Sequence, residues 1–179
     1  MKKLILSAVV AFAAMTANAQ VWIGGGLGFT QTNYDNLMFE PDQTSFYIAP
    51  EIGYTLNDKW DLAISIGDTY TSFDPGDSSN NFFVSPYARY TFFKTGKVGF
   101  FLDGLFAVQA GDDPTEWAVG IRPGVKFAAS DKVTFVASFG FLGYSKAEDQ
   151  YDRFGFEFNG NGPDNPFKGG LSFGCYYSF

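Results

Sequence analysis

Alternation of apolar with small or polar side chains is the feature that most constrains how this chain folds. Across residues 46–54, the even positions hold Phe, Ile, Pro, Ile and Tyr, and the odd positions hold Tyr, Ala, Glu and Gly. A period of two places successive side chains on opposite faces of a β-strand. The pattern recurs and predicts eight strands, at about 21–30, 45–55, 60–71, 82–92, 98–109, 116–128, 133–144 and 167–179.

The lengths of the strands and of their connections indicate a membrane barrel. Each predicted strand reaches the roughly 9–11 residues that a tilted membrane-spanning strand needs. Short turns alternate with connections that are mostly longer and polar; the turns are 56–59, 93–97 and 129–132, and the loops are 31–44, 72–81, 110–115 and 145–166. Short turns on one rim, longer loops on the other and an even strand count are typical of outer-membrane barrels. We therefore predict an all-β fold, an eight-stranded antiparallel up-and-down transmembrane β-barrel over residues 20–179.

The alternative is a soluble barrel, apolar inside and wet outside. Only 17% of the residues are charged, whereas a water-facing exterior carries roughly 25–35%. Ser, Gly and Ala dominate the polar face, as a narrow lumen requires. The apolar face is therefore assigned to lipid; in the seventh strand this places Phe139 and Phe141 outside and Gly140 and Leu142 inside.

The first 19 residues form a separate segment. Two lysines precede an apolar run over residues 4–14, and Ala17-Asn18-Ala19 has small side chains at the positions read by signal peptidase. The run is too short to span a bilayer. We expect residues 1–19 to be a secretory signal peptide, cleaved between Ala19 and Gln20.

Three prolines recur inside predicted strands. Pro50, Pro86 and Pro123 are 36 and 37 residues apart, and each is followed four residues later by Tyr or Phe. The repeat unit is one hairpin. Because proline donates no hydrogen bond to a ladder, we predict a bulge or a locally open ladder at each proline.

Six charged residues fall on the lumen face. Three acids and three bases make up the set: Glu51, Asp61, Arg89, Asp103, Arg122 and Lys126. Isolated charges in a narrow, dry interior are costly, so pairing is expected. The cluster is interpreted either as a salt-bridged plug or as the gate of a narrow pore, and the plug is favoured because an eight-stranded barrel is just wide enough for side chains to fill.

Aromatic residues mark both predicted membrane interfaces. Aromatic girdles are expected at the two headgroup levels. The candidates next to the short turns are Tyr54, Trp60, Tyr90 and Phe127, and the candidate next to a longer loop is Trp117.

Composition excludes several classes of function. The chain has no His and a single Cys, a net charge of −7 and a pI near 4.4. Without His it lacks the usual general base and metal ligand, so we expect no enzyme activity, no metal and no cofactor. Cys175 is predicted to face lipid, which makes it a poor nucleophile. The acidic balance argues against nucleic acid.

The predicted loops are strongly acidic. They contain twelve carboxylates against Lys146 and Arg153 alone. Divalent cations could bridge such loops to anionic lipopolysaccharide. However, neither residues 74–77 nor residues 112–116 match a defined calcium loop, so a solvated rim is favoured. Residues 145–166 are interpreted as a protruding β-extension that presents a surface to partners, together with loop 31–44.

The motif Pro50-Glu51-Ile52-Gly53-Tyr54, followed by a short turn and a new strand, resembles the small outer-membrane β-barrel domain family common in Bacteroidota. The resemblance covers essentially all of residues 20–179 and extends more distantly to the OmpX and OmpA-barrel class. It implies the outer membrane of a Gram-negative bacterium, with its lipids and lipopolysaccharide as surroundings. The terminal aromatics Phe173, Tyr177 and Phe179 look like the signal read by the barrel-assembly machinery.

The expected role is non-enzymatic: a monomeric barrel with a structural or surface-interaction function, exerted through its acidic extracellular loops. One fold hosts many functions, so family membership does not imply an activity. The alternative is a narrow, porin-like pore gated by the charges of the lumen.

Overall fold

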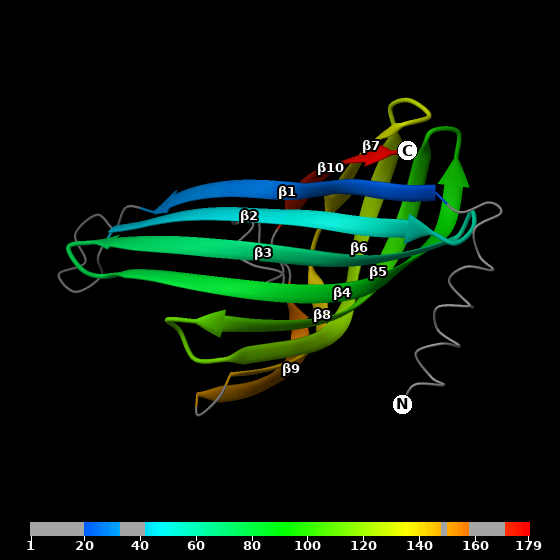
Figure 1. Ribbon diagram of the computed structural model, residues 1–179. Coiled ribbons are helices and arrows are strands. Elements are labelled where there is room, and N and C mark those ends of the chain that lie inside the picture. The colour runs from blue at the N-terminus through cyan, green and yellow to red at the C-terminus, as the bar shows by residue number, and fades with distance from the viewer. Residues whose placement is uncertain (1–19, 33–41, 148–149, 158–170) are drawn as a thin grey trace, which may run out of the picture.

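A computed structural model describes residues 20–32, 42–147, 150–157 and 171–179 (Figure 1). The expected signal peptide, residues 1–19, lies outside the described residues. The strands are β1 (Gln20–Thr32), β2 (Asp42–Thr55), β3 (Trp60–Asp74), β4 (Ser78–Thr95), β5 (Val98–Gly111), β6 (Glu116–Ala128), β7 (Val133–Ser138), β8 (Phe141–Ala147), β9 (Tyr151–Glu157) and β10 (Ser172–Ser178). Within these ranges, the structure has no helix of the length and apolarity needed to cross a bilayer.

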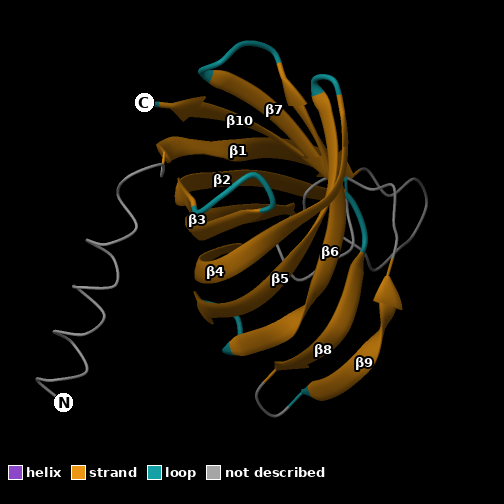
Figure 2. Ribbon diagram, turned by 90° about the vertical axis from the view of Figure 1, so that its right-hand side faces the viewer, coloured by secondary structure: helices purple, strands orange, loops and turns teal. Residues whose placement is uncertain are grey.

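The strands form a closed antiparallel ring, which confirms the predicted eight-stranded barrel. β1 to β6 pair in sequence order, β6 pairs with β7, and β10 joins β7 back to β1. β7 and β8 are two halves of one wall strand, because both pair with the same edge of β6, and β5 pairs with the other edge. The ring is seen in Figure 2, where β8 and β9 extend the wall beyond β6.

A bulge at Gly140 separates β7 from β8 and corrects one prediction. Gly124 of β6 pairs with Ser138, but Ile121 pairs with Leu142, so the register shifts by one residue. Gly140 has φ of 71°, in the left-handed region that glycine adopts readily. The shift exchanges the two faces beyond this point. Phe141 is therefore buried and Leu142 exposed, which is the reverse of the assignment made from strict alternation.

The strands run further toward the loop rim than the sequence pattern predicted. The expected loop 72–81 shrinks to a three-residue turn between β3 and β4, because residues 78–81 continue the ladder with residues 69–72. The expected β-extension within 145–166 is present as β9, paired with β8. It folds back beside the barrel rather than protruding, since Phe154 and Tyr144 are level with Val119 of the wall.

The three prolines interrupt the ladder as predicted. Between β2 and β3, the pairing passes from Ile48–Asp68 to Glu51–Ser65 with no pair at Pro50 in this described stretch. Between β4 and β5, the ladder likewise omits Pro86. Pro123 lies opposite the Gly140 bulge, where the carbonyl of Pro123 accepts from the Phe139 N–H at 3.0 Å. Each proline thus leaves a local opening on one side of its strand.

The barrel interior is filled by aromatic rings that lie over glycines. Four cross-strand pairs share this arrangement: Trp22–Gly53, Tyr176–Gly24, Phe83–Gly67 and Phe101–Gly124. A Cβ atom on any of these glycines would come within 2.2 Å of the ring opposite. The missing side chain therefore makes the space that each ring occupies.

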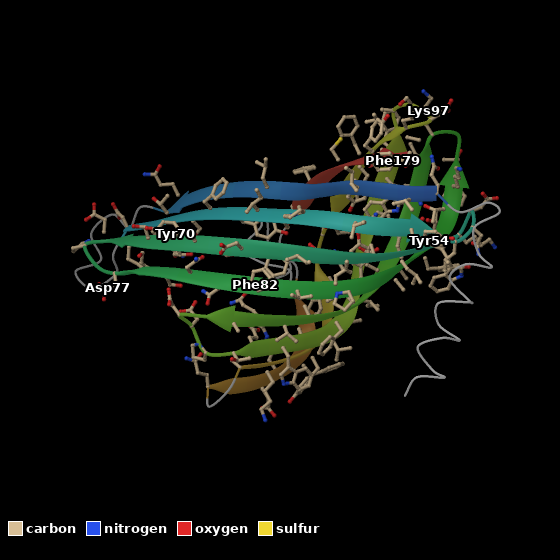
Figure 3. The ribbon with its side chains drawn as sticks, in the orientation of Figure 1. Tyr54, Tyr70, Asp77, Phe82, Lys97 and Phe179 are labelled. Atoms are coloured by element: carbon tan, nitrogen blue, oxygen red, sulfur yellow. The ribbon has the colours of Figure 1, made fainter. Side chains whose placement is uncertain are left out.

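The outward face is mainly apolar, with Tyr70 and Phe82 toward the loop end and Tyr54 toward the turn end (Figure 3). Exposed large apolar side chains occur on the ring strands β1 to β6 and β10. This is the surface that a lipid-facing wall requires.

Candidate functional site: the charged waist of the barrel

All six predicted lumen charges lie on the interior face, and the structure joins five of them through three ion pairs. At the centre, Asp103 of β5 accepts two hydrogen bonds from Arg89 of β4, at 2.7 and 3.0 Å. Arg122 of β6 reaches the same carboxylate at 3.4 Å. The side chains of Arg89 and Asp103 are 3% and 0% exposed. The Arg89 guanidinium also lies 3.9 Å from the centre of the Phe101 ring, a cation–π contact.

The sixth charge, Glu51, is held by tyrosines. Its Oε2 accepts from the hydroxyls of Tyr87 at 2.6 Å and Tyr176 at 2.9 Å. Charged acceptors strengthen such bonds, so two ring hydroxyls replace much of the lost hydration. Tyr176 comes from β10 and Tyr87 from β4, which means that Glu51 ties opposite walls of the ring together.

The third ion pair lies toward the turn rim. Lys126 of β6 contacts Asp61 of β3 at 3.2 Å, and the hydroxyl of Thr55 donates to the same carboxylate at 2.7 Å. The pair spans the barrel interior, because β3 and β6 are not neighbours in the ring. We call the side chains of Glu51, Asp61, Arg89, Asp103, Arg122 and Lys126 the charged waist.

The tyrosines and Phe101 were missed as site residues by sequence reasoning. Alternation alone places Phe101 and Tyr176 on the lumen face, so the signal for their position was present. Their role was not visible, because the partner Glu51 is 36 residues from Tyr87 and 125 residues from Tyr176. Only closure of the ring brings these groups together.

The predicted interface aromatics occupy strand ends. Trp60 and Tyr90 pack at the turn end with ring centres 4.8 Å apart, and Trp117 packs on Tyr144 near the loop rim at 5.3 Å. Tyr54 is half-buried and Phe127 exposed, both beside turns. Their assignment to the headgroup levels remains a prediction.

The terminal aromatics point outward. Phe173, Tyr177 and Phe179 are exposed, and the Phe179 N–H donates to the carbonyl of Val21 at 3.1 Å. This bond lies beside the β1–β10 ladder, where the ring closes. Recognition of these side chains by an assembly machinery remains a prediction. Cys175 is exposed on the same face.

Two aspartates of the acidic loop rim are hydrogen-bonded to the neighbouring strand. Asp113 accepts from the amide of Asn81 at 2.6 Å and from the hydroxyl of Ser79 at 3.2 Å, and Asp112 accepts from the backbone N–H of Asn80 at 2.8 Å. These contacts clasp the β5–β6 loop onto β4. No group of three or more His, Cys, Asp or Glu arranged to hold a metal ion occurs among the residues that the structure describes.

Comparison with known proteins places this geometry in a family. A family model described as outer membrane protein beta-barrel domain matches residues 4–179. Neisserial surface protein A is similar in fold, with a TM-score of 0.50 and 16% identity over 90% of this chain and 96% of that chain. Ail of Yersinia pestis gives a TM-score of 0.48 and 17% identity over 90% and 100%. A loop-deletion mutant of OmpT of Vibrio cholerae gives 0.39 and 13% over 90% and 50%.

Among curated proteins, none matches the sequence. At 16% identity, the first structural likeness supports the fold alone. The family match covers nearly the whole chain and agrees with the closed ring, the apolar outward face and the filled polar interior. The chain therefore belongs to the outer membrane protein beta-barrel domain family and is an outer-membrane β-barrel protein.

Proposed function

We propose that this protein is a sealed, non-enzymatic outer-membrane barrel whose role is structural or is exerted by its loop-side surface. The observation that carries the proposal is the burial of Arg89 and Asp103 at the waist, 3% and 0% exposed. The enclosure of these two side chains supports a lumen that is closed at the waist. The ion pairs of the waist link different strands of the barrel and so stiffen it.

The loop-side rim supports the surface role. Asp77, Asp112 and Asp113 are exposed there, whereas Lys97 is exposed at the opposite rim (Figure 3). The clasp between Asp113 and Asn81 presents carboxylates from a fixed scaffold instead of a free loop. Lipids surround the wall, and lipopolysaccharide is the anionic lipid that such a rim would meet through bridging divalent cations.

The proposal that the protein is not an enzyme rests on the kinds of side chain that it contains and on their contacts. The sequence contains no His, and the three carboxylates of the charged waist are engaged by arginines, a lysine and tyrosines. Cys175 lies on the outward face, away from these groups. A reaction centre would need an accessible nucleophile beside a base.

Single-channel recording tests the seal and decides between this proposal and a narrow pore. The protein is purified from outer membranes and inserted in a planar bilayer, and a heat-shift gel on the same sample verifies that it is folded. We expect no current steps from the wild type. The double variant Arg89→Ala/Asp103→Ala, which removes the central pair and with it the carboxylate that Arg122 contacts, should conduct. Discrete steps from the folded wild type would replace the sealed barrel with the gated pore.

Complementation then separates the structural role from the surface role. A strain lacking the protein should lose resistance to detergents and regain it with the wild type. The variant Asp77→Asn/Asp112→Asn/Asp113→Asn, compared at equal folded levels, tests the rim. If this variant does not restore detergent resistance, the surface role is established. If it restores resistance fully, the structural role remains.

A further inference from the structure

A groove of about 570 Å³ lies on the outward face of the barrel, at the seam where β1 meets β10. Exposed apolar side chains from four strands border it: Leu27, Ile48, Phe135 and Phe173. Because acyl chains surround the outward wall of an outer-membrane barrel, this groove is open to hydrocarbon.

The backbone fixes the depth of the groove. Gly25 lies in its middle, paired with Pro50 of β2 on one side and with Cys175 of β10 on the other. Its φ of 142° is one that residues with a side chain rarely adopt, and an added Cβ would collide with the carbonyl oxygen of Ala49. The strand geometry at the seam therefore keeps this position free of a side chain.

The groove leads toward the turn rim. Phe135 and Cys175 are cross-strand partners that both line it, and the next outward pair is Val133 with Tyr177, about 7 Å further along the strands. Lys132 directly precedes Val133 and is the last residue of the turn between β6 and β7. The outward wall below the groove therefore ends at this turn.

Two exposed polar side chains lie where this wall meets the turn. The Lys132 Nζ donates to the hydroxyl of Tyr177 at 3.4 Å and lies 5.5 Å from the centre of the tyrosine ring. The hydroxyl accepts from Lys132 and keeps its own O–H to donate. An exposed ammonium beside a hydroxyl donor is a favourable place for a phosphate oxygen, because hydrogen bonds to a charged acceptor are the stronger kind.

An exposed acid adjoins this pair. Asp131 directly precedes Lys132 in the turn. In the described part of the chain, neither residue belongs to an ion pair, and the three ion pairs found there all lie in the charged waist. The turn therefore offers one positive and one negative group, on consecutive residues, to a ligand at the membrane surface.

These charges select the headgroup. A phosphate suits Lys132 and Tyr177, and a primary ammonium suits Asp131. Phosphatidylethanolamine carries both groups, whereas phosphatidylglycerol has no ammonium and the quaternary ammonium of phosphatidylcholine has no N–H to donate. Short turns face the periplasm in this architecture, and phospholipids make up the leaflet of the outer membrane on that side.

We propose that the outward face of β7, β10 and β1 binds one phosphatidylethanolamine molecule at the turn rim. The phosphate accepts from the Lys132 Nζ and from the Tyr177 hydroxyl, the ammonium donates to Asp131, and one acyl chain runs past Phe135 into the groove. The three headgroup contacts and the groove all lie on exposed surface. The lipid therefore binds from the membrane side and leaves the charged waist intact.

Native mass spectrometry tests the site on the whole protein by counting the lipids bound to it. The chain is purified from outer membranes, delipidated in detergent and verified as folded by a heat-shift gel. It is then titrated separately with dioleoyl phosphatidylethanolamine, phosphatidylglycerol and phosphatidylcholine. We expect the first phosphatidylethanolamine to bind about fivefold more tightly than either other lipid. Equal dissociation constants for the three lipids would overturn the proposal.

Two charge variants have different expected effects. Lys132→Gln should raise the dissociation constant of all three lipids about fivefold, because each carries a phosphate. Asp131→Asn should raise that of phosphatidylethanolamine alone, to the value for phosphatidylglycerol. The matched control is Lys146→Gln, an exposed lysine of β8 near the loop rim, which should change each constant by less than about twofold. An unchanged titration in folded Lys132→Gln, or an equal loss in Lys146→Gln, would contradict the site.

A third variant tests the groove and leaves every charge in place. Cys175→Trp fills the groove beside Gly25 with an apolar side chain, so the first lipid of each kind should bind at least about threefold more weakly. Cys175→Ser, which adds no bulk, is its control and should bind as the wild type does. If the tryptophan variant is folded and also binds as the wild type does, the acyl chain does not occupy the groove and the proposal is wrong.

Discussion

Single interior glycines determine how the aromatic residues fill the barrel. Gly67 lies under Phe83, and an added Cβ would stand 2.2 Å from the tip of that ring. We expect Gly67→Ala to lower the free energy of unfolding by ~1–3 kcal/mol, because the ring and its neighbours must shift. Urea unfolding in vesicles, followed by the fluorescence of the three tryptophans, measures the change.

The matched control is Gly104→Ala, on the outward face. There, the added Cβ would meet only the carbonyl of Ala88, at 3.9 Å. Alanine replaces the most flexible residue at no steric cost, so stability should be unchanged or rise by ~0.5–1 kcal/mol. If the two alanine variants were equally unstable, the fit of ring over glycine would not be what sets the packing.

Asp103 is the residue on which the waist depends. It accepts from both Arg89 and Arg122 while fully buried. Asp103→Asn leaves two guanidinium groups without their shared counter-charge, and we expect a loss of ~3–5 kcal/mol. Asp61→Asn, whose partner Lys126 is 24% exposed, should cost less, because water compensates part of the lost pair. The same unfolding assay compares them, and a larger loss at Asp61 would contradict this ranking.

At the scale of elements, the openings in the ladder come from the prolines. Pro50 and Pro86 are outward and exposed, and the register on either side of each is unchanged. Pro86→Val restores an N–H opposite β5 without adding a polar group to the lipid face. We expect one newly protected amide at residue 86 in hydrogen exchange and a gain of ~0.5–1.5 kcal/mol in stability. An amide that exchanges freely would show that the gap is imposed by strand geometry, not by proline.

Strand number, faces and interruptions could be predicted from periodicity, but the boundaries could not. Residues 78–81 are Ser, Ser, Asn and Asn, a composition typical of loops, yet the backbone of β3 continues alongside and supplies ladder partners whatever the side chains. The sequence pattern did not predict the Gly140 bulge, for another reason. One glycine in an apolar run does not reveal that the period has slipped, and the slip exchanged the faces of Phe141 and Leu142.

At the scale of the whole molecule, the same limit applies to the site. Alternation placed six charges on the lumen face, but the choice of partners depends on the stagger of the strands around the ring. Arg89 and Asp103 are direct cross-strand partners and could be matched once the hairpin was known. Asp61 and Lys126 meet across the lumen, and Glu51 meets Tyr176 only through closure, so neither contact follows from local sequence.

The two rims of the closed barrel differ in charge, and this difference predicts its orientation. Asp77 lies in the β3–β4 turn, and Lys97 lies in the short turn at the opposite end (Figure 3). Residues 33–41 connect β1 to β2 at the same rim as Asp77, and longer connections face outward in this architecture, which assigns the Asp77 rim to the cell surface. In a Cys175→Ser background, which removes the single native thiol, Asp77→Cys should react with a bulky maleimide on intact cells. Lys97→Cys should react only after the outer membrane is permeabilised, and the reverse pattern would invert the proposed topology, moving the acidic rim to the periplasm.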